Sequence, residues 1–447
     1  MRCWTLWLAL LALSLFSCRD ASAPSADVVL TIVSPHHDHI QTEFADAFRT
    51  WYRATYGESV EVRFQQRGGT SDIVRYVTSE FASKRASGTA DEGIGIDVFF
   101  GGGLPAAEAL KAAGCTVAIT LPADVLALQP AELAGIPMRD PERHWYGNVL
   151  AAFGIVFNKK ALTAAGVSEP STWTDLASES MSGRVILADP NKSASIAVCF
   201  ELILQKQGWE RGWATLMRIG GNTREFKPTS SQVAPDVAQG VGWAGMCIAV
   251  YGHSQIGKSG SDLVGYVSPV GATAYTPDPI AVLRGCRDLT LATRFVTFTL
   301  SEPGQALWTL PAGHPNGPKA HTLYRMPAIP LIYDKYAEAI TVPSRPFADP
   351  TGFVYDAALE RRRSPLIGPL IRAAFLKNLD LSRRAWQAVI DSKYDAALVA
   401  EFEKPPFDEQ EGLQLAREHH GDPRRALELD RQWYEFFRAK YERLLSQ

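Results

Sequence analysis

The chain has 447 residues, 46% of them apolar, and a formal net charge of −3. The length predicts two to three structural units, and the apolar content is enough for a sizeable core. The near-neutral charge gives no electrostatic reason to expect a nucleic acid as a partner, and the composition is not that of a disordered chain.

The first residues have the features of an export signal. Arg2 supplies a positive charge, and the apolar run from Cys3 to Phe16 is too short to span a bilayer as a permanent helix. Its end, Leu15-Phe16-Ser17-Cys18, resembles the lipobox of bacterial lipoproteins, in which cleavage leaves a lipidated cysteine. We therefore predict a lipoprotein signal peptide over 1–18, lipidation of Cys18 and a polar tether over 19–26. An ordinary cleaved signal with an incidental cysteine stays open as the alternative.

The first third of the chain alternates between strand and helix patterns. The β-branched run Val28–Ser34 predicts a buried strand, and helical periodicity follows from about Ile40 to Tyr56. A second strand is predicted over Val60–Phe64 and a third over Ile94–Phe100, with an amphipathic helix between them. This rhythm predicts an α/β fold with a mostly parallel sheet and helices on both sides.

The same pattern returns in the middle of the chain. Strands are predicted over Leu150–Asn158, Val185–Leu187 and Cys247–Tyr251, and a helix from about Ser195 to Gln207. Tyr266–Tyr275 is expected to be extended. Further helices are predicted over 292–300 and 304–307. Two such α/β units joined by more than one strand would make a two-lobed clamp.

Beyond about residue 350 the composition becomes helical and rich in charge. Asp422-Pro423 is typical of a helix start, with the aspartate as the N-cap and proline at the first helical position. The last predicted helix carries a one-sided apolar stripe of Trp433, Phe437, Tyr441, Leu444 and Leu445. We expect this stripe to pack on the same protein, with a partner-binding face as the alternative.

Several short segments, in order and spacing, carry a resemblance to a known family. They are Ser34-Pro35-His36, Gly68-Gly69-Thr70-Ser71, Asp97–Gly103, Phe153–Lys159, Trp173-Thr174-Asp175-Leu176, Gly183-Arg184-Val185, Ala188-Asp189-Pro190, Pro277–Ala281 and Leu300–Gln305. Over about residues 28–330 the chain resembles the extracellular solute-binding proteins of ABC importers, in the cluster that includes ferric-ion, aminoalkylphosphonate and sugar-phosphate binders.

The resemblance implies the type II periplasmic-binding fold, with hinge strands between two lobes and here a helical C-terminal extension. Lobe 1 is expected to comprise 27–149 plus 270–345, lobe 2 to comprise 155–265, and the extension to comprise 350–447. It implies an exported protein, in the periplasm or at the cell surface, that performs no chemistry. Its partners would be a small ligand, an ABC permease and, through the lipid anchor, a membrane.

Candidate ligand-binding residues lie where strands end and helices begin. Ligands of open α/β sheets bind beyond the carboxyl ends of the strands, and helix N-termini favour anionic oxygen. Glycine there lets the backbone approach a ligand. The candidates are Ser34, Pro35, His36, Gly68, Gly69, Thr70, Ser71, Gly101, Gly102, Gly103, Ser193, Ala194, Ser195, Ser230, Ser231, Gln232 and Tyr251. A small oxyanion such as an organic phosphate or phosphonate is the preferred ligand class.

A ferric-ion complex is the second ligand class. In the ferric binders two adjacent tyrosines near this place coordinate iron. Tyr251 matches the first, but Gly252 stands at the second position and His253 follows. A complex held by Tyr251, His253 and an oxygen from the ligand stays open. The cluster His36-His37-Asp38-His39 suggests a metal less strongly, because its spacing on a loop is loose. No resident cofactor is expected.

Two enzyme classes must be weighed against binding. Gly252–Ser259 matches the phosphate-loop pattern G-x-x-x-x-G-K-S of NTPases, but the glycine-rich residues after it cannot form the long helix that the motif requires. A secreted hydrolase is the other alternative, although no G-x-S-x-G or H-E-x-x-H motif occurs. The cysteines leave pairing open: Cys115, Cys199, Cys247 and Cys286 allow three disulfide arrangements or buried free thiols.

Overall fold

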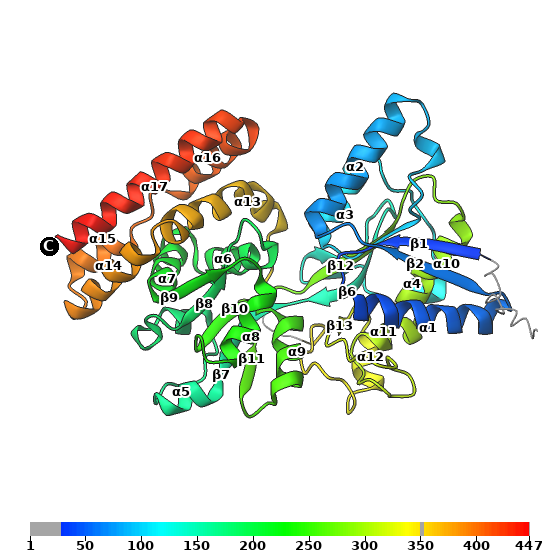
Figure 1. Ribbon diagram of the computed structural model, residues 1–447, viewed down its shortest axis with the longest axis horizontal. Helices are drawn as coiled ribbons and strands as arrows, with labels where there is room; N and C mark the ends of the chain where they lie inside the picture. Colours follow the sequence, from blue (N-terminus) through cyan, green and yellow to red (C-terminus); the bar gives the residue numbers. More distant parts are fainter. Residues whose placement is uncertain (1–27, 349–352, 447) are drawn as a thin grey trace, which may run out of the picture.

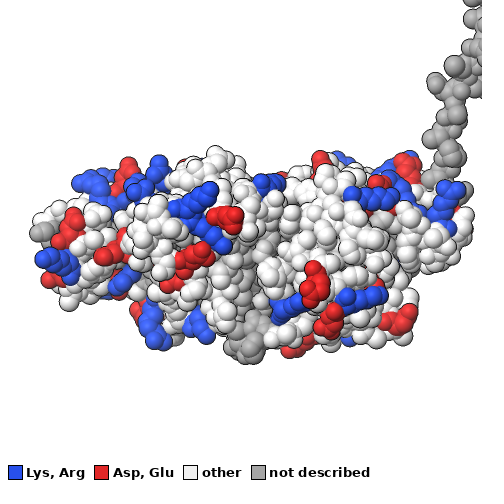
Figure 2. All heavy atoms as spheres, turned by 90° about the horizontal axis from the view of Figure 1, so that it is seen from below, with Lys and Arg blue, Asp and Glu red and all other residues white. Residues whose placement is uncertain are grey.

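The computed structural model describes residues 28–348 and 353–446. The predicted signal peptide, the tether and Cys18 lie outside these residues. The described chain forms two sheet-containing lobes and a group of C-terminal helices, arranged in a row (Figure 1). Within these ranges no helix combines the length and apolar character needed to cross a membrane. Figure 2 shows acidic and basic side chains interspersed over one face of the molecule.

Lobe 1 is built on a six-stranded sheet with the order β13-β6-β12-β3-β1-β2. β1 pairs in parallel with both β2 and β3, whereas β12 pairs antiparallel with β3 and β6. The predicted parallel pairing of β1 with its neighbours is confirmed, but the expectation of a mostly parallel sheet is wrong. The sheet is mixed, because β12 and β13 return to it antiparallel to β3 and β6. The strands are β1 (Val28–Val33), β2 (Val60–Gln65), β3 (Val98–Phe100), β6 (Tyr146–Ala151), β12 (Thr276–Val282) and β13 (Met326–Pro327), with a separate hairpin of β4 (Glu132–Leu133) and β5 (Ile136–Pro137).

Helices cover both faces of this sheet. Phe44, Phe48 and Tyr52 recur every four residues along α1, and all three are buried in a cluster with the apolar side of α10. The other face is covered by α2 and α3, through Ile73, Val77 and other buried residues. The helices of lobe 1 are α1 (Asp38–Tyr56), α2 (Thr70–Ala86), α3 (Leu104–Ala112), α4 (Ala123–Leu128), α10 (Leu289–Leu300), α11 (Glu302–Leu307) and α12 (Pro330–Lys335).

Lobe 2 is built on a five-stranded sheet with the order β11-β7-β10-β8-β9. Its three inner strands β7, β10 and β8 are almost wholly apolar, and α6 and α8 pack against this sheet. The elements are β7 (Phe153–Asn158), β8 (Val185–Ala188), β9 (Thr223–Lys227), β10 (Ala244–Ile248), β11 (Val264–Val267), α5 (Lys159–Ala164), α6 (Ala194–Gln207), α7 (Trp209–Asn222), α8 (Val233–Ala238) and α9 (Ala249–Ser259).

The chain passes between the lobes at a break in an apolar run. A single strand over Leu150–Asn158 was the expectation, but Ala152 separates β6 from β7. β6 pairs with strands of lobe 1 and β7 with strands of lobe 2, so one continuous run serves two sheets. The return crossing runs through 268–275, between β11 and β12. Tyr266–Tyr275 is thus a strand only as far as Val267.

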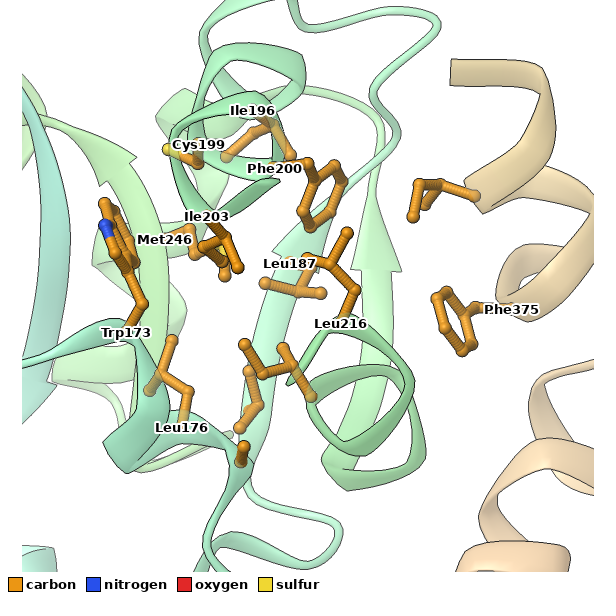
Figure 3. Packing of buried hydrophobic residues seen from close by; sticks show 14 of the residues in the cluster. Trp173, Leu176, Leu187, Ile196, Cys199, Phe200, Ile203, Leu216, Met246 and Phe375 are labelled. Atoms are coloured by element: carbon orange, nitrogen blue, oxygen red, sulfur yellow. The ribbon is translucent and has the colours of Figure 1, made fainter. Parts of the chain in front are cut away.

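The C-terminal helices α13–α17 pack against lobe 2. Phe375 faces the cluster that contains Phe200 and Leu216 (Figure 3). The stripe on α17 is buried, with Trp433, Phe437, Tyr441 and Leu444 at most 4% exposed, so its predicted packing on the same protein is confirmed. The elements are α13 (Ala357–Ile371), a short π-helix (Arg372–Leu376), α14 (Leu379–Asp391), α15 (Ala396–Glu403), α16 (Glu409–Gly421) and α17 (Pro423–Leu445).

The attachment of these helices depends on close approach and on buried polar contacts. A Cβ on Gly220 of α7 would lie 2.1 Å from the Phe375 ring, and one on Gly221 would lie 2.6 Å from Trp386. Trp386 Nε1 donates to Asn222 Oδ1 at 2.6 Å. The predicted cap is present as well, because the Asp422 side chain accepts from the first backbone N–H groups of α17.

Candidate functional site

Three loops of lobe 1 meet at one edge of its sheet, where β1, β2 and β3 end. Ser34 Oγ donates to the carbonyl of Phe100 at 2.7 Å and accepts from the backbone N–H of His36 at 3.1 Å. The ring of His36 lies beside Gly101, where a Cβ would approach it to 2.5 Å. The segments around residues 35 and 101 are therefore in contact, as expected for neighbouring parallel strands.

The glycine run after β3 needs a conformation that other residues rarely adopt. Gly101 and Gly102 have φ values of +101° and +92°. A Cβ on Gly102 would lie 3.1 Å from Thr70 Cγ2, so this run also touches the first residue of α2. Gly69, in contrast, has ordinary φ and open space around it. Its backbone N–H is bonded to Asp72 Oδ2 at 3.3 Å.

The lobe 2 candidates gather at the N-terminus of α6. The hydroxyls of Ser193 and Ser195 lie 3.2 Å apart, and Ser195 Oγ lies 3.0 Å from Ser230 Oγ. Ser230 begins a short 3-10 helix (Ser230–Gln232) that precedes α8. Ser231 Oγ lies 2.8 Å from Thr229 Oγ1. Two loops far apart in sequence thus place three hydroxyls in a row. Ala194, the first residue of α6, lies within this row.

Helix α9 of lobe 2 lies against lobe 1. The ring of Tyr251 is 6.4 Å from that of His37, and a Cβ on Gly257 would lie 2.1 Å from the hydroxyl of Tyr324. Leu104, directly after the glycine run of lobe 1, packs against the core cluster of lobe 2. The candidate loops of lobe 1 and the core of lobe 2 are therefore neighbours.

The prediction that Tyr251 ends a strand is wrong. β10 ends at Ile248, and Tyr251 is the third residue of α9. The phosphate-loop pattern of Gly252–Ser259 also lies inside this helix. The motif needs a loop whose free N–H groups surround phosphates, whereas here those N–H groups belong to helical turns. The helical conformation of this segment excludes a phosphate-loop NTPase site here.

Asp278 and Arg325 were not among the predicted site residues. Asp278 lies on β12 beside the glycine run, and its Oδ1 accepts from the backbone N–H of Gly103 at 2.6 Å. Its Oδ2 lies 2.9 Å from Arg325 Nη2 and 3.3 Å from His36 Nε2. The signal in the sequence was the aspartate between two prolines, Pro277 and Pro279, as the one charged residue of strand β12.

Burial and the neighbouring charges shift the pKa values of Asp278 and His36 away from their usual values in water. Burial alone would raise the pKa of Asp278, but the hydrogen bond from His36 and the positive charge of Arg325 outweigh it and hold that pKa well below its usual value. Burial lowers the pKa of His36, against the opposing effect of Asp278. A neutral His36 that donates from Nε2 has an acceptor at Nδ1, and this buried atom has no partner among the described residues.

The proposed metal pair has separate surroundings. Tyr251 and His253 are two residues apart on α9, a spacing that places side chains on different sides of a helix. The His253 ring packs on Tyr266 at 4.9 Å, and burial lowers the pKa of His253 to about 4. In the part of the chain that the structure describes, His, Cys, Asp and Glu side chains form no group of three or more that could hold a metal ion. The four described cysteines are free thiols.

Comparison with known proteins adds a family match and structural likenesses. The family model described as bacterial extracellular solute-binding protein matches residues 93–327. The phosphoglycerate transport regulatory protein PgtC of Salmonella typhimurium is 31% identical over 158 residues, which are 35% of this chain and 39% of that protein. The match thus spans about two fifths of that relative's length.

Two solved structures share the fold at low identity. The periplasmic binding protein AfuA from Actinobacillus pleuropneumoniae, with exogenous fructose-6-phosphate bound, has a TM-score of 0.53 at 18% identity and covers 83% of this chain and 100% of its own. Apo ferric ion-binding protein A of Pasteurella haemolytica has a TM-score of 0.53 at 15% identity, with 74% and 95% covered. These likenesses confirm the type II periplasmic-binding fold.

Proposed function

Because the chain belongs to the bacterial extracellular solute-binding proteins, we propose that it holds a small oxyanion between its lobes and delivers it to an ABC permease. The favoured ligand is an organic phosphate or phosphonate. Binding involves no covalent step. The ligand stabilises a closed arrangement of the lobes to the extent that it binds that arrangement more tightly than the open one.

The observation that supports this proposal is the clustering of helix N-termini and hydroxyls within each lobe. α1, α2 and α3 begin beside the contacts among His36, Thr70 and the glycine run, and α6 begins at the serine row. The first N–H groups of a helix have no partner within it and attract anionic oxygen. The unpartnered Nδ1 of His36 adds an acceptor for a ligand hydroxyl.

Three considerations favour an oxyanion over a ferric complex. Burial raises the pKa of Tyr251, which disfavours the phenolate that binds iron. Tyr251 and His253 have different neighbours. The 31% identity to a phosphoglycerate transport regulatory protein, over 35% of the chain, makes a phosphorylated organic acid the first compound to try.

Calorimetric titration of the purified protein tests the ligand class. The compounds are 3-phosphoglycerate, fructose 6-phosphate, 2-aminoethylphosphonate, ferric citrate and ATP. We expect saturable binding of at least one of the first three. If ferric citrate binds and none of the first three compounds does, the ligand is a ferric complex and not an oxyanion. Release of inorganic phosphate at a useful rate would establish the secreted hydrolase instead.

Ser195→Ala tests the serine row. Loss of one hydroxyl hydrogen bond is expected to weaken binding of the phosphate compound by about three- to tenfold, the equivalent of ~1 kcal/mol. Ser261→Ala is the matched control, because Ser261 is exposed in the turn after α9. Equal affinities of the two variants would remove the serine row from the site.

We also propose export and lipid attachment through Cys18. The support is the apolar run before it and the lipobox-like residues Leu15–Cys18. Metabolic labelling with palmitate is expected to mark the wild-type protein and not Cys18→Ser. An unlabelled wild-type protein recovered free in the periplasm would establish an ordinary signal peptide.

A further inference from the structure

The C-terminal helices contact the lobe 2 loop that carries candidate ligand groups. This loop joins β8 to α6, and Asn191 lies in it. Asn191 Nδ2 donates to the carbonyl of Gly368 in α13 at 3.0 Å. The same amide lies 3.2 Å from Asp189 Oδ1, which also accepts from the Asn191 backbone N–H at 3.0 Å. One asparagine thus joins the loop to itself and to α13.

α13 is also attached to α6 by a buried ion pair. Arg363 Nη1 lies 2.9 Å from Glu201 Oε1 of α6, and both side chains are 3% exposed. Gly368 is buried, and a Cβ there would lie 2.8 Å from Asn191 Oδ1. Any larger residue at 368 must therefore displace the Asn191 side chain.

The contact continues to the serine row through short backbone bonds. The carbonyl of Asp189 accepts from the N–H groups of Lys192 and Ser193 at 3.0 and 2.9 Å. Ser193 is the residue before α6, and its hydroxyl is next to that of Ser195. A displacement of Asn191 is thus transmitted over two residues to the groups that face the proposed ligand.

We propose that α13 is a positioning element of the ligand site, with Gly368 acting through Asn191 on the loop 189–193. This inference rests on the proposed function and deepens it, because it gives the C-terminal helices a role in affinity. Gly368 is a positioning residue and does not touch the ligand.

The test is a double-mutant cycle of Gly368→Ala and Asn191→Ala in the full protein, with 3-phosphoglycerate and fructose 6-phosphate as probes. Gly368→Ala is expected to weaken binding about five- to tenfold, a size typical of coupling between sites. Its melting temperature should change little, because the better helix propensity of alanine offsets the loss of the Asn191 hydrogen bond. The double variant should bind no more weakly than Asn191→Ala alone. Gly421→Ala is the control, because a Cβ there meets nothing within 4 Å.

Hydrogen exchange of the peptide covering 189–196 provides a readout that needs no ligand. Exchange should be faster in Gly368→Ala than in wild type and unchanged in Gly421→Ala. Additive losses in the cycle, or unchanged exchange, would overturn the positioning role. If the wild-type protein binds neither probe, the proposed function fails for phosphate ligands, and the exchange result alone decides this inference.

Discussion

Thr273 and Phe153 join the two crossings between the lobes. The Thr273 hydroxyl donates to the Phe153 carbonyl at 2.8 Å and accepts from the Phe153 backbone N–H at 3.2 Å. Phe153 is the first residue after the break at Ala152, and Thr273 lies in the return segment. The two connections between the lobes are thus hydrogen-bonded to each other.

Thr273→Val should destabilise the protein by about 1–3 kcal/mol, because it leaves a buried N–H and a buried carbonyl without their partner. Urea unfolding measures this loss. Thr297→Val is the control, since it removes only one bond within α10, and we expect a change of about 0.5 kcal/mol or less. Equal effects of both substitutions would show that this bond pair contributes nothing particular to the hinge.

Asp278→Asn should destabilise the protein by about 3–5 kcal/mol at pH 7, because Arg325 is then buried without its counter-charge. The pKa of Asp278 is held below its usual value in the folded state. Its contribution is therefore complete above the unfolded pKa of about 4 and is lost as the pH falls from there towards the lower folded pKa.

Unfolding measured between pH 7 and pH 2 should show the wild type and Asp278→Asn converging at the acidic end. Asp262→Asn, at an exposed carboxylate, is the control and should follow the wild type. A difference that stays constant with pH would contradict the pKa assigned to Asp278.

The two glycine loops of lobe 1 should respond differently to valine. Gly69→Val places a side chain in open space, so folding should be retained while ligand affinity falls. Gly102→Val forces a β-branched residue to a φ of +92° and against Phe99, so it should also lower the free energy of unfolding, by about 2 kcal/mol or more. Circular dichroism melts and titration with 3-phosphoglycerate separate the two effects. If Gly102→Val is as stable as the wild type, valine at this position does not strain the backbone as we expect.

Lys440→Met should stabilise the protein. Lys440 is 1% exposed, and burial lowers its pKa to about 7, against the opposing charge of Glu401. In the unfolded chain the pKa is about 10.4, so the cost of the buried lysine is complete below pH ~7 and disappears as the pH rises towards ~10. We expect a gain of about 1–3 kcal/mol at pH 6.

The gain from Lys440→Met should shrink or reverse at pH 10, where the neutral amine still donates to the Lys404 carbonyl. Guanidinium unfolding at the two pH values measures the difference. Lys319→Met, at an exposed position, is the control. A gain that grows with pH would contradict a neutral buried lysine.

Local signals were enough to predict where most of the candidate loops lie in the fold. Glycine, serine or proline within three residues after β1, β2, β3 and β8 marks the strand ends, and parallel pairing brings neighbouring ends together. The alternation of strands and helices likewise predicted the α/β lobes. These features depend on residues close together in the sequence, which is why they could be read from it.

Two features depended on distant residues and could not be predicted locally. The apolar run Cys247–Tyr251 is typical of a strand, yet the chain becomes helical at Ala249, where Gly252 packs on Tyr266 and Gly257 on Tyr324. The pair Asp278–Arg325 is 47 residues apart, and no spacing rule connects a strand to the segment before β13. Contacts between residues far apart in the sequence determine both the helix that begins at Ala249 and the Asp278–Arg325 pair.

The glycine pair in α7 makes the evolution of lobe 2 depend on that of the C-terminal helices. Gly220 and Gly221 leave just the space that Phe375 and Trp386 occupy. Without the extension, α7 would expose an apolar surface with two weak helix formers in its last turn, whereas side chains at 220 and 221 would push the extension away. Loss of the extension in a descendant would therefore favour new substitutions at both glycines, and an adjacent glycine pair at this point of α7 would forecast a helical extension in a related chain.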